Sequence, residues 1–87
     1  MDIKILGPGC AKCHSLLKTV HEAVTEMKVN ITVEEVKDIK KIMEYPILMT
    51  PGLVIDGKVV SSGKVLKKDE VKKLITIAME KGKIGNI

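Results

Sequence analysis

The sequence predicts an α/β domain with the element order β-α-β-α-β-β-α, in which helices cover both faces of a four-stranded mixed sheet. Three observations lead to this class. Two long segments have helical periodicity, short apolar runs alternate with the helical segments, and an Asp-Gly pair separates two β-branched runs. A chain of 87 residues makes one small domain, so we expect a single domain over residues 1–87 with a loose tail at 82–87.

The first half of the chain predicts a βαβ unit. Residues 3–6 form a short apolar strand, and the glycines and proline at 7–9 end it with a sharp turn. From residue 10 onward, apolar side chains recur every three or four positions, which predicts an amphipathic helix that ends near Asn30. Residues 31–36 form the second strand. Short strand–helix–strand units are right-handed, so the two strands should run parallel.

A short helix and an unassigned connection follow. Asp38 is a suitable N-cap for a helix that carries Ile39, Ile42 and Met43 on one face. The segment 45–49 contains Pro46 and has no clear assignment from its pattern.

The second half of the chain predicts a hairpin and a closing helix. Asp56-Gly57 lies between the apolar runs 52–55 and 58–60, which is a strong pattern for a two-residue hairpin turn. Ser61-Ser62-Gly63 predicts another turn. The last helix is predicted from apolar residues at helical spacing, namely Val71, Leu74, Ile75 and Ala78. The lysines at 67, 68, 72 and 73 form a basic strip on it, which is a solvated face or at best a weak docking site for an acidic partner.

The composition argues against several classes of function. The net charge of +4 comes from lysines alone, and the chain has one aromatic residue, Tyr45. Base stacking needs aromatic side chains and bidentate phosphate recognition favours arginine, so no nucleic-acid partner is expected. No apolar run approaches the roughly 20 residues that span a bilayer, and the first residues lack a signal-peptide pattern. We therefore expect a cytoplasmic monomer with no membrane partner.

The chemistry of the chain centres on its two cysteines, Cys10 and Cys13, at the start of the first predicted helix. Unpaired backbone N–H groups and the helix dipole favour an anionic sulfur at a helix N-terminus. Such a thiolate attacks disulfides, and a second thiol one turn away can resolve the mixed disulfide. The spacing therefore predicts dithiol–disulfide exchange, with the Cys10–Cys13 disulfide in place of any cofactor.

Two other interpretations of the cysteine pair stay open. A zinc site would need Cys10, Cys13, His14 and His21, but His21 lies eight residues beyond Cys13, roughly 12 Å along a helix. Metal binding or transfer would thus need a ligand from outside the chain. Cys10 to His14 also matches the C-x-x-C-H pattern of covalent haem attachment, which would demand an export signal and a haem pocket.

Three motifs together connect the chain with a known family. They are Gly7 to Cys13 (Gly-x-Gly-Cys-Ala-x-Cys), Thr50 to Lys58 (Thr-Pro-Gly-Leu-Val-Ile-Asp-Gly-Lys), and the terminal helix. The sequence resembles the thioredoxin/glutaredoxin superfamily, and more narrowly the small thioredoxin-like redox-active disulfide proteins of archaea and bacteria. The resemblance extends from Ile3 to about Lys81, and it implies a thioredoxin-like fold.

The resemblance also implies roles for individual residues. In the family the first cysteine attacks and the second resolves, which here are Cys10 and Cys13. A family proline that faces the cysteines is cis, and Pro51 matches it; from the residues alone we would expect a trans Thr50–Pro51 bond. Thr50 and Pro51 would then bind an extended substrate segment. Gly9 and Lys12, which lie close to Cys10 in the sequence, are further candidates for substrate binding or positioning.

The sequence departs from the family at two places that bear on substrate and mechanism. Lys4 stands where thioredoxins carry a buried acid, and Ser61-Ser62 stands where glutaredoxins carry two glycines that accommodate glutathione. Serine side chains would crowd that space. We therefore expect a protein disulfide as substrate and an upstream reductase as partner, with glutathione-dependent activity as the less favoured alternative. The roles of His14 and Tyr45 are left open.

Overall fold

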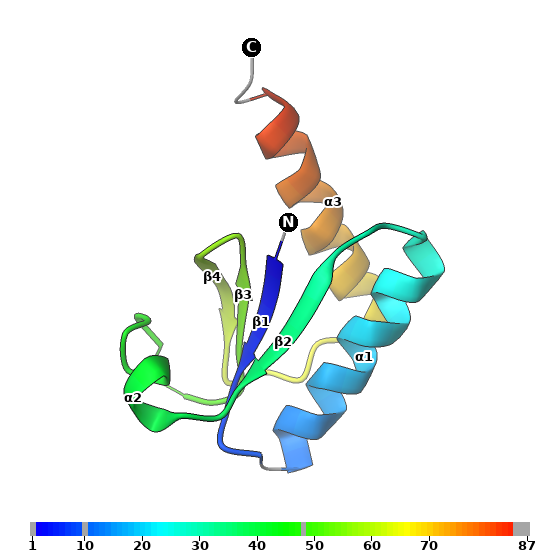
Figure 1. The fold of residues 1–87 in the computed structure, drawn as a ribbon. Helices are drawn as coiled ribbons and strands as arrows, with labels where there is room; N and C mark the ends of the chain where they lie inside the picture. The colour runs from blue at the N-terminus through cyan, green and yellow to red at the C-terminus, as the bar shows by residue number, and fades with distance from the viewer. Residues whose placement is uncertain (1, 10, 48, 85–87) are drawn as a thin grey trace.

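The computed structural model describes residues 2–9, 11–47 and 49–84. The elements are β1 (Asp2–Leu6), α1 (Ala11–Met27), β2 (Thr32–Val36), α2 (Ile39–Ile42), β3 (Gly52–Ile55), β4 (Lys58–Ser62) and α3 (Lys68–Ile84). The strands form one mixed sheet in the order β2-β1-β3-β4. Helices α1 and α3 cover one face of this sheet and α2 lies on the other, as Figure 1 shows. The predicted fold class is confirmed.

The sheet is built around β1, the strand that leads into the cysteine motif. β1 pairs parallel with β2, with Ile5 opposite Glu35, and antiparallel with β3. The predicted hairpin is confirmed, because Asp56 (φ 50°) and Gly57 (φ 82°) both adopt the left-handed conformation of a type I′ turn. The predicted turn at 61–63 begins later than expected, because residues 61 and 62 still pair with β3 and belong to β4.

Two groups of buried side chains hold the layers together. The larger lies between the sheet and helices α1 and α3; it comprises Ile3, Ile5, Leu16, Val20, Ala23, Leu53, Ile55, Leu66, Val71 and Ile75. The smaller lies under α2 and comprises Leu6, Val36, Ile42 and Val54, with Tyr45 packed against it. Tyr45 therefore packs against the face of the sheet on which α2 lies.

Helix α2 buries less of its apolar surface than the sequence predicted. Asp38 is the N-cap, as expected, and its Oδ1 accepts a hydrogen bond from Lys40 N–H at 3.0 Å. Ile42 is 7% exposed, but Ile39 is 62% exposed and Met43 is 76% exposed. The three residues keep the predicted helical spacing, but a four-residue helix is about one turn long and buries only Ile42 against the sheet.

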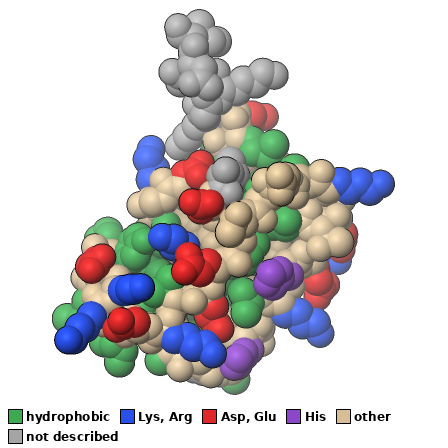
Figure 2. Space-filling model, viewed as in Figure 1, with side chains coloured by type: hydrophobic (Ala, Val, Ile, Leu, Met, Phe, Trp, Pro, Cys, Tyr) green, Lys and Arg blue, Asp and Glu red, His purple; other side chains and the backbone are tan. Residues whose placement is uncertain are grey.

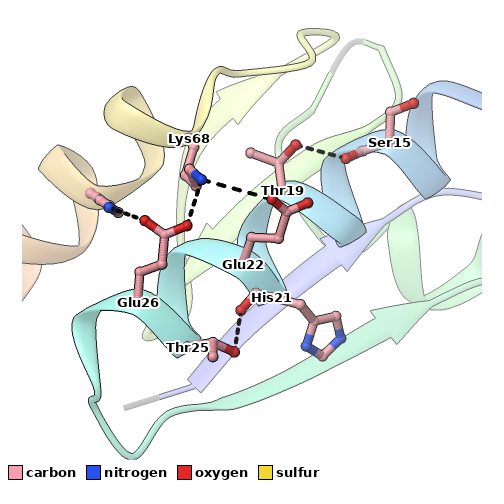
Figure 3. Close-up of polar contacts among 8 residues, drawn as sticks. Ser15, Thr19, His21, Glu22, Thr25, Glu26 and Lys68 are labelled. Atoms are coloured by element: carbon pink, nitrogen blue, oxygen red, sulfur yellow. Dashed lines mark hydrogen bonds and ion pairs between the residues drawn. The ribbon is translucent and has the colours of Figure 1, made fainter.

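Ion pairs join α1 to α3 on the outer surface (Figure 3). Glu26 on α1 accepts hydrogen bonds from Lys68 and from Lys72, the latter at 2.6 Å, and Glu22 lies 3.9 Å from Lys68. The two lysines lower the pKa of Glu26 from its ordinary value of 4.5 to about 2, and Glu26 raises the pKa of Lys68. Two members of the predicted basic strip are thus neutralised by acids of the neighbouring helix.

Helix α3 differs from its predicted bounds at the C-terminal end. Glu70 accepts a hydrogen bond from the Lys67 N–H at 3.4 Å, which satisfies one of the exposed donors at the helix start. The helix continues to Ile84, so residues 82–84 are not the predicted loose tail; residues 85–87 lie outside the described part. A glycine in a helix interior lowers helix stability by about 1 kcal/mol relative to alanine. This is too little to end a helix whose preceding turns pack against the rest of the domain. In the described residues, no helix is long and apolar enough to cross a membrane.

Candidate functional site

The candidate site lies where β1 ends and α1 begins. Gly7 is buried, and its N–H donates to the Val36 carbonyl at 2.9 Å, which extends the β1–β2 pairing by one residue. Gly9 has φ 96°, a conformation that favours glycine and turns the chain toward α1. The predicted nucleophile Cys10 lies outside the described residues, immediately before Ala11, the first residue of α1.

Cys13 lies in the first turn of α1 and is 0% exposed. It is packed against Gly7, because a Cβ placed on Gly7 would overlap the Sγ of Cys13 and lie 3.2 Å from its Cβ. The same hypothetical Cβ would lie 3.9 Å from the Cβ of Thr50. The structure therefore brings Gly7, Cys13 and Thr50 together, although they come from three separate segments. The sequence places Gly7 in a turn and in the cysteine motif, but it does not predict this contact with Cys13.

The Thr50–Pro51 peptide bond is cis, in agreement with the family resemblance and against the trans bond expected from the residues alone. Pro51 is buried and Thr50 is half-buried. The Pro51 carbonyl accepts a hydrogen bond from Gly63 N–H at 2.8 Å, directly before β3 begins at Gly52. This bond ties the segment that carries Thr50 to the end of β4.

Ser62 and Gly63 fix the residue before Thr50. The Ser62 hydroxyl accepts a hydrogen bond from Met49 N–H at 3.3 Å and donates one to the Met49 carbonyl at 3.0 Å. Gly63 has φ 75°, and a Cβ on it would lie 2.9 Å from the Cβ of Met49. From the sequence, Ser61-Ser62-Gly63 was predicted to form a turn, and the two serines were predicted to crowd the space that glutathione would need. Their contact with Met49 is tertiary, and the local sequence contains no sign of it.

Comparison with known proteins identifies the family. A family model described as "Thioredoxin domain" matches residues 1–76. The chain belongs to the thioredoxin domain family. It is 38% identical over 76 residues to a protein named "Thioredoxin" from Methanothermobacter thermautotrophicus, an alignment that covers 87% of this chain and 99% of the relative. It is 32% identical over 78 residues to a "Thioredoxin" from Methanocaldococcus jannaschii, which covers 90% of each chain.

Membership of the thioredoxin domain family makes the chain, in general terms, a thiol–disulfide oxidoreductase. The match over residues 1–76 includes the cysteine motif, the Thr50–Pro51 bond and the first half of α3. The recognition made from the sequence motifs is therefore confirmed.

The remaining predicted residues of this thioredoxin-family site are at its surface. Lys12 and His14 are exposed, as is His21 further along α1. Gly9 borders open space, because a Cβ placed on it would have no atom within 4 Å. Across the residues that the structure describes, no three His, Cys, Asp or Glu side chains lie close enough together to hold a metal ion. Cys10, a member of the alternative ligand set, lies outside them.

An apolar hollow of about 300 Å³ lies beside Thr50. Its lining residues come from α2 and the connection to β3, namely Ile42, Met43, Tyr45, Ile47, Met49 and Thr50. Met43 is 76% exposed and Met49 is 63% exposed. Methionine is flexible and polarizable, and it is common on surfaces that accept varied partners. The candidate site is therefore bordered by a hollow whose lining side chains are mainly apolar.

Proposed function

We propose that this protein exchanges a Cys10–Cys13 dithiol or disulfide with disulfides of other proteins, with Cys10 as the nucleophile and Cys13 as the resolving thiol. The observation that carries the proposal is the burial of Cys13, which is 0% exposed and packed against Gly7. A sulfur in that position is shielded from a protein disulfide. The first attack therefore falls to Cys10, its neighbour at the start of the helix.

The proposed reaction has two balanced steps. In the first, the Cys10 thiolate forms a bond with one sulfur of the target disulfide, the target S–S bond breaks, and the released target thiolate takes a proton. In the second, the Cys13 thiolate attacks the Cys10 sulfur and releases the second target thiol. The target gains two electrons and two protons, while Cys10 and Cys13 become a disulfide. An upstream reductase returns the two electrons for the next cycle.

Cys13 is well placed in the sequence to act second, because it follows Cys10 by three residues. Gly7 supports this role by leaving room for the Cys13 sulfur, which lies at the end of β1. Thr50 lies against the same place, so a target segment bound along Thr50 would present its sulfur to this end of the helix. In this proposal the two sulfurs supply all the redox chemistry, without a bound cofactor.

Cysteine-to-serine variants test the assignment of roles. We expect Cys10→Ser to abolish reduction of a protein disulfide, because the remaining thiol, Cys13, is buried. Cys13→Ser should instead accumulate a mixed disulfide through Cys10, because the thiol that normally releases the target is missing. Each variant serves as the control for the other, since both remove one sulfur from the same helix end. Intact-mass spectrometry of the reaction measures the adduct directly.

Three results would count against the proposal. A mixed disulfide that forms on Cys10→Ser rather than on Cys13→Ser would reverse the two roles. Adducts with glutathione alone, together with efficient reduction of glutathionylated substrates by the wild type, would assign the activity to the glutaredoxin class. A complete absence of disulfide reduction by the wild type would remove the function itself.

A further inference from the structure

The net positive charge of the protein falls in segments of the chain that meet near the candidate site. Three segments meet at this end of the sheet, and their described residues are 7–9 and 11–15, 37–47 and 49–51, and 61–67. They hold six of the fifteen lysines but two of the eleven acidic residues, and so they account for the whole net charge of +4. In the view of Figure 2, lysine side chains lie over α2 and the lower edge of the molecule, with acidic groups between some of them. We call the six lysines the basic rim; they are Lys12, Lys37, Lys40, Lys41, Lys64 and Lys67.

Contacts join the three segments into one surface. Gly7 in the first packs against Cys13 and lies near Thr50 of the second. Met49 of the second is hydrogen-bonded to Ser62 of the third. The parallel strands β1 and β2 end at this edge of the sheet, and the antiparallel strand β3 begins there (Figure 1). The segments that carry the basic rim therefore meet at the end of the sheet that holds the site and the hollow beside Thr50.

Most of the basic rim is uncompensated. Among the described residues, the lysines with a carboxylate within 4 Å are Lys37, Lys68 and Lys72, and of these Lys37 alone belongs to the rim. The other five rim lysines are exposed and have no ion pair with a described residue. The predicted basic strip on α3 differs in this respect, because Lys68 and Lys72 are held by Glu26.

Glu35 pairs with the rim residue Lys37, whereas the two acids that lie within the three segments, Asp38 and Glu44, form no ion pair with a described rim lysine. The Asp38 carboxylate is hydrogen-bonded to the backbone of α2, where it caps the helix. Glu44 is exposed, and no ion pair within 4 Å joins it to Lys40, Lys41 or another described lysine. A partner surface of opposite charge would therefore meet five of the six rim lysines without displacing an ion pair between described residues.

We infer that the basic rim selects acidic protein substrates, and that the bound segment places an apolar side chain in the hollow beside Thr50. This inference rests on the proposed disulfide exchange and specifies its substrate class. Exposed charges steer a partner of opposite charge over distances near the Debye length, which is about 8 Å at physiological ionic strength. The hollow supplies the short-range contact, since Met43 and Met49 can adapt to different apolar side chains.

The inference can be tested with three peptide disulfides that differ only in charge. Each peptide carries the same internal disulfide and one leucine, flanked by glutamate, glutamine or lysine. The rate constant for reduction by the reduced wild-type protein is measured at about 0.01 M and about 1 M salt. We expect the acidic peptide to react about tenfold faster than the basic one at low salt, and the three rates to converge at high salt, where the Debye length is about 3 Å.

Paired variants locate the effect on the surface. Lys40→Gln/Lys41→Gln removes two rim charges on α2, the helix that contributes Ile42 to the hollow, and we expect it to slow the acidic peptide about fivefold at low salt. Lys28→Gln/Lys58→Gln is the matched control, because it removes two exposed lysines at the opposite end of the sheet, at the end of α1 and beside the hairpin turn. The control should change the rate by less than about twofold, although its net charge is the same.

The possible outcomes separate this inference from the proposed function. Failure to reduce the neutral peptide would overturn disulfide exchange itself. Reduction of all three peptides at equal rates at low salt, or an equal effect of both lysine pairs, would leave the exchange intact and overturn the acidic preference. Inhibition by a short DNA duplex as strong as that by a cysteine-free acidic peptide would assign the rim to polyanions in general, and would overturn the choice of a protein partner.

Discussion

Gly7→Ala should disturb the site through one added methyl group. Gly7 is not among the residues with positive φ, so alanine fits its backbone and the effect is steric. The new Cβ would overlap the Sγ of Cys13, which would have to move by on the order of 1 Å to reach an optimal separation of about 3.5 Å. Overpacking of a buried site costs about 1–3 kcal/mol. For a domain of this size we expect the melting temperature to fall by roughly 4–8 °C per kcal/mol.

The same displacement should reduce activity, because Cys13 must reach the Cys10 sulfur in the second step. A misplacement of about 1 Å can cost up to about a hundredfold in rate, so we expect turnover with a protein disulfide to fall at least tenfold. Urea unfolding and steady-state reduction of the same substrate measure the two effects on one preparation.

Gly57→Ala is the matched control for this experiment. Gly57 has φ 82° with nothing within 4 Å of a hypothetical Cβ, and it lies in the hairpin at the opposite end of β3. Its replacement should cost about 1–2 kcal/mol through the backbone alone and leave turnover unchanged at temperatures where the variant is folded. The packing argument is refuted if Gly7→Ala has the unfolding free energy and the turnover of the wild type.

Three further predictions follow from other contacts. Ser62→Ala removes both side-chain bonds to Met49; we expect a loss of about 1 kcal/mol and faster amide exchange at Met49, and unchanged exchange would show that these bonds do not hold the segment. Glu26 is stabilising while it is ionised, so its contribution is present above about pH 4.5 and is lost as the pH falls toward 2. Glu26→Gln should flatten the unfolding free energy across that range, and an unaltered pH profile would contradict the ion-pair assignment. Purified protein should contain less than a stoichiometric amount of zinc or iron by elemental analysis; one tightly held equivalent would favour the metal-binding alternative.

The sequence predicted those parts of the fold that local patterns specify. The amphipathic period of α1, the Asp56-Gly57 turn and the Asp38 cap each have a short-range physical cause, and all three are present in the structure. The exposure of Ile39 and Met43 was not predictable in this way, because it depends on how the short α2 lies on the sheet. The extension of α3 through Gly82 likewise depends on packing upstream of the glycine.

The candidate site was also predicted only in part, because some of its features are local in the sequence and others depend on tertiary contacts. The cysteine spacing is local, and the family resemblance gave the expectation that Pro51 faces the cysteines. The contact between Gly7 and Cys13 and the bonds between Ser62 and Met49 join residues that are brought together by the folded sheet. The uncompensated state of the basic rim also required the structure, because the sequence alone gives lysine positions without their ion-pair partners.

The assignment of Cys10 as the nucleophile and Cys13 as the resolving thiol can be tested directly by the alkylation rates of the two thiols. These rates are measured against pH in the reduced wild-type protein. Peptide mapping by mass spectrometry assigns each modification to Cys10 or Cys13. If Cys10 is the nucleophile, it should be alkylated first at every pH at which the protein is folded. Cys13, which is 0% exposed, should react slowly until the protein unfolds. Faster alkylation of Cys13, or equal rates at the two thiols in the folded protein, would contradict the assignment of Cys10 as the nucleophile.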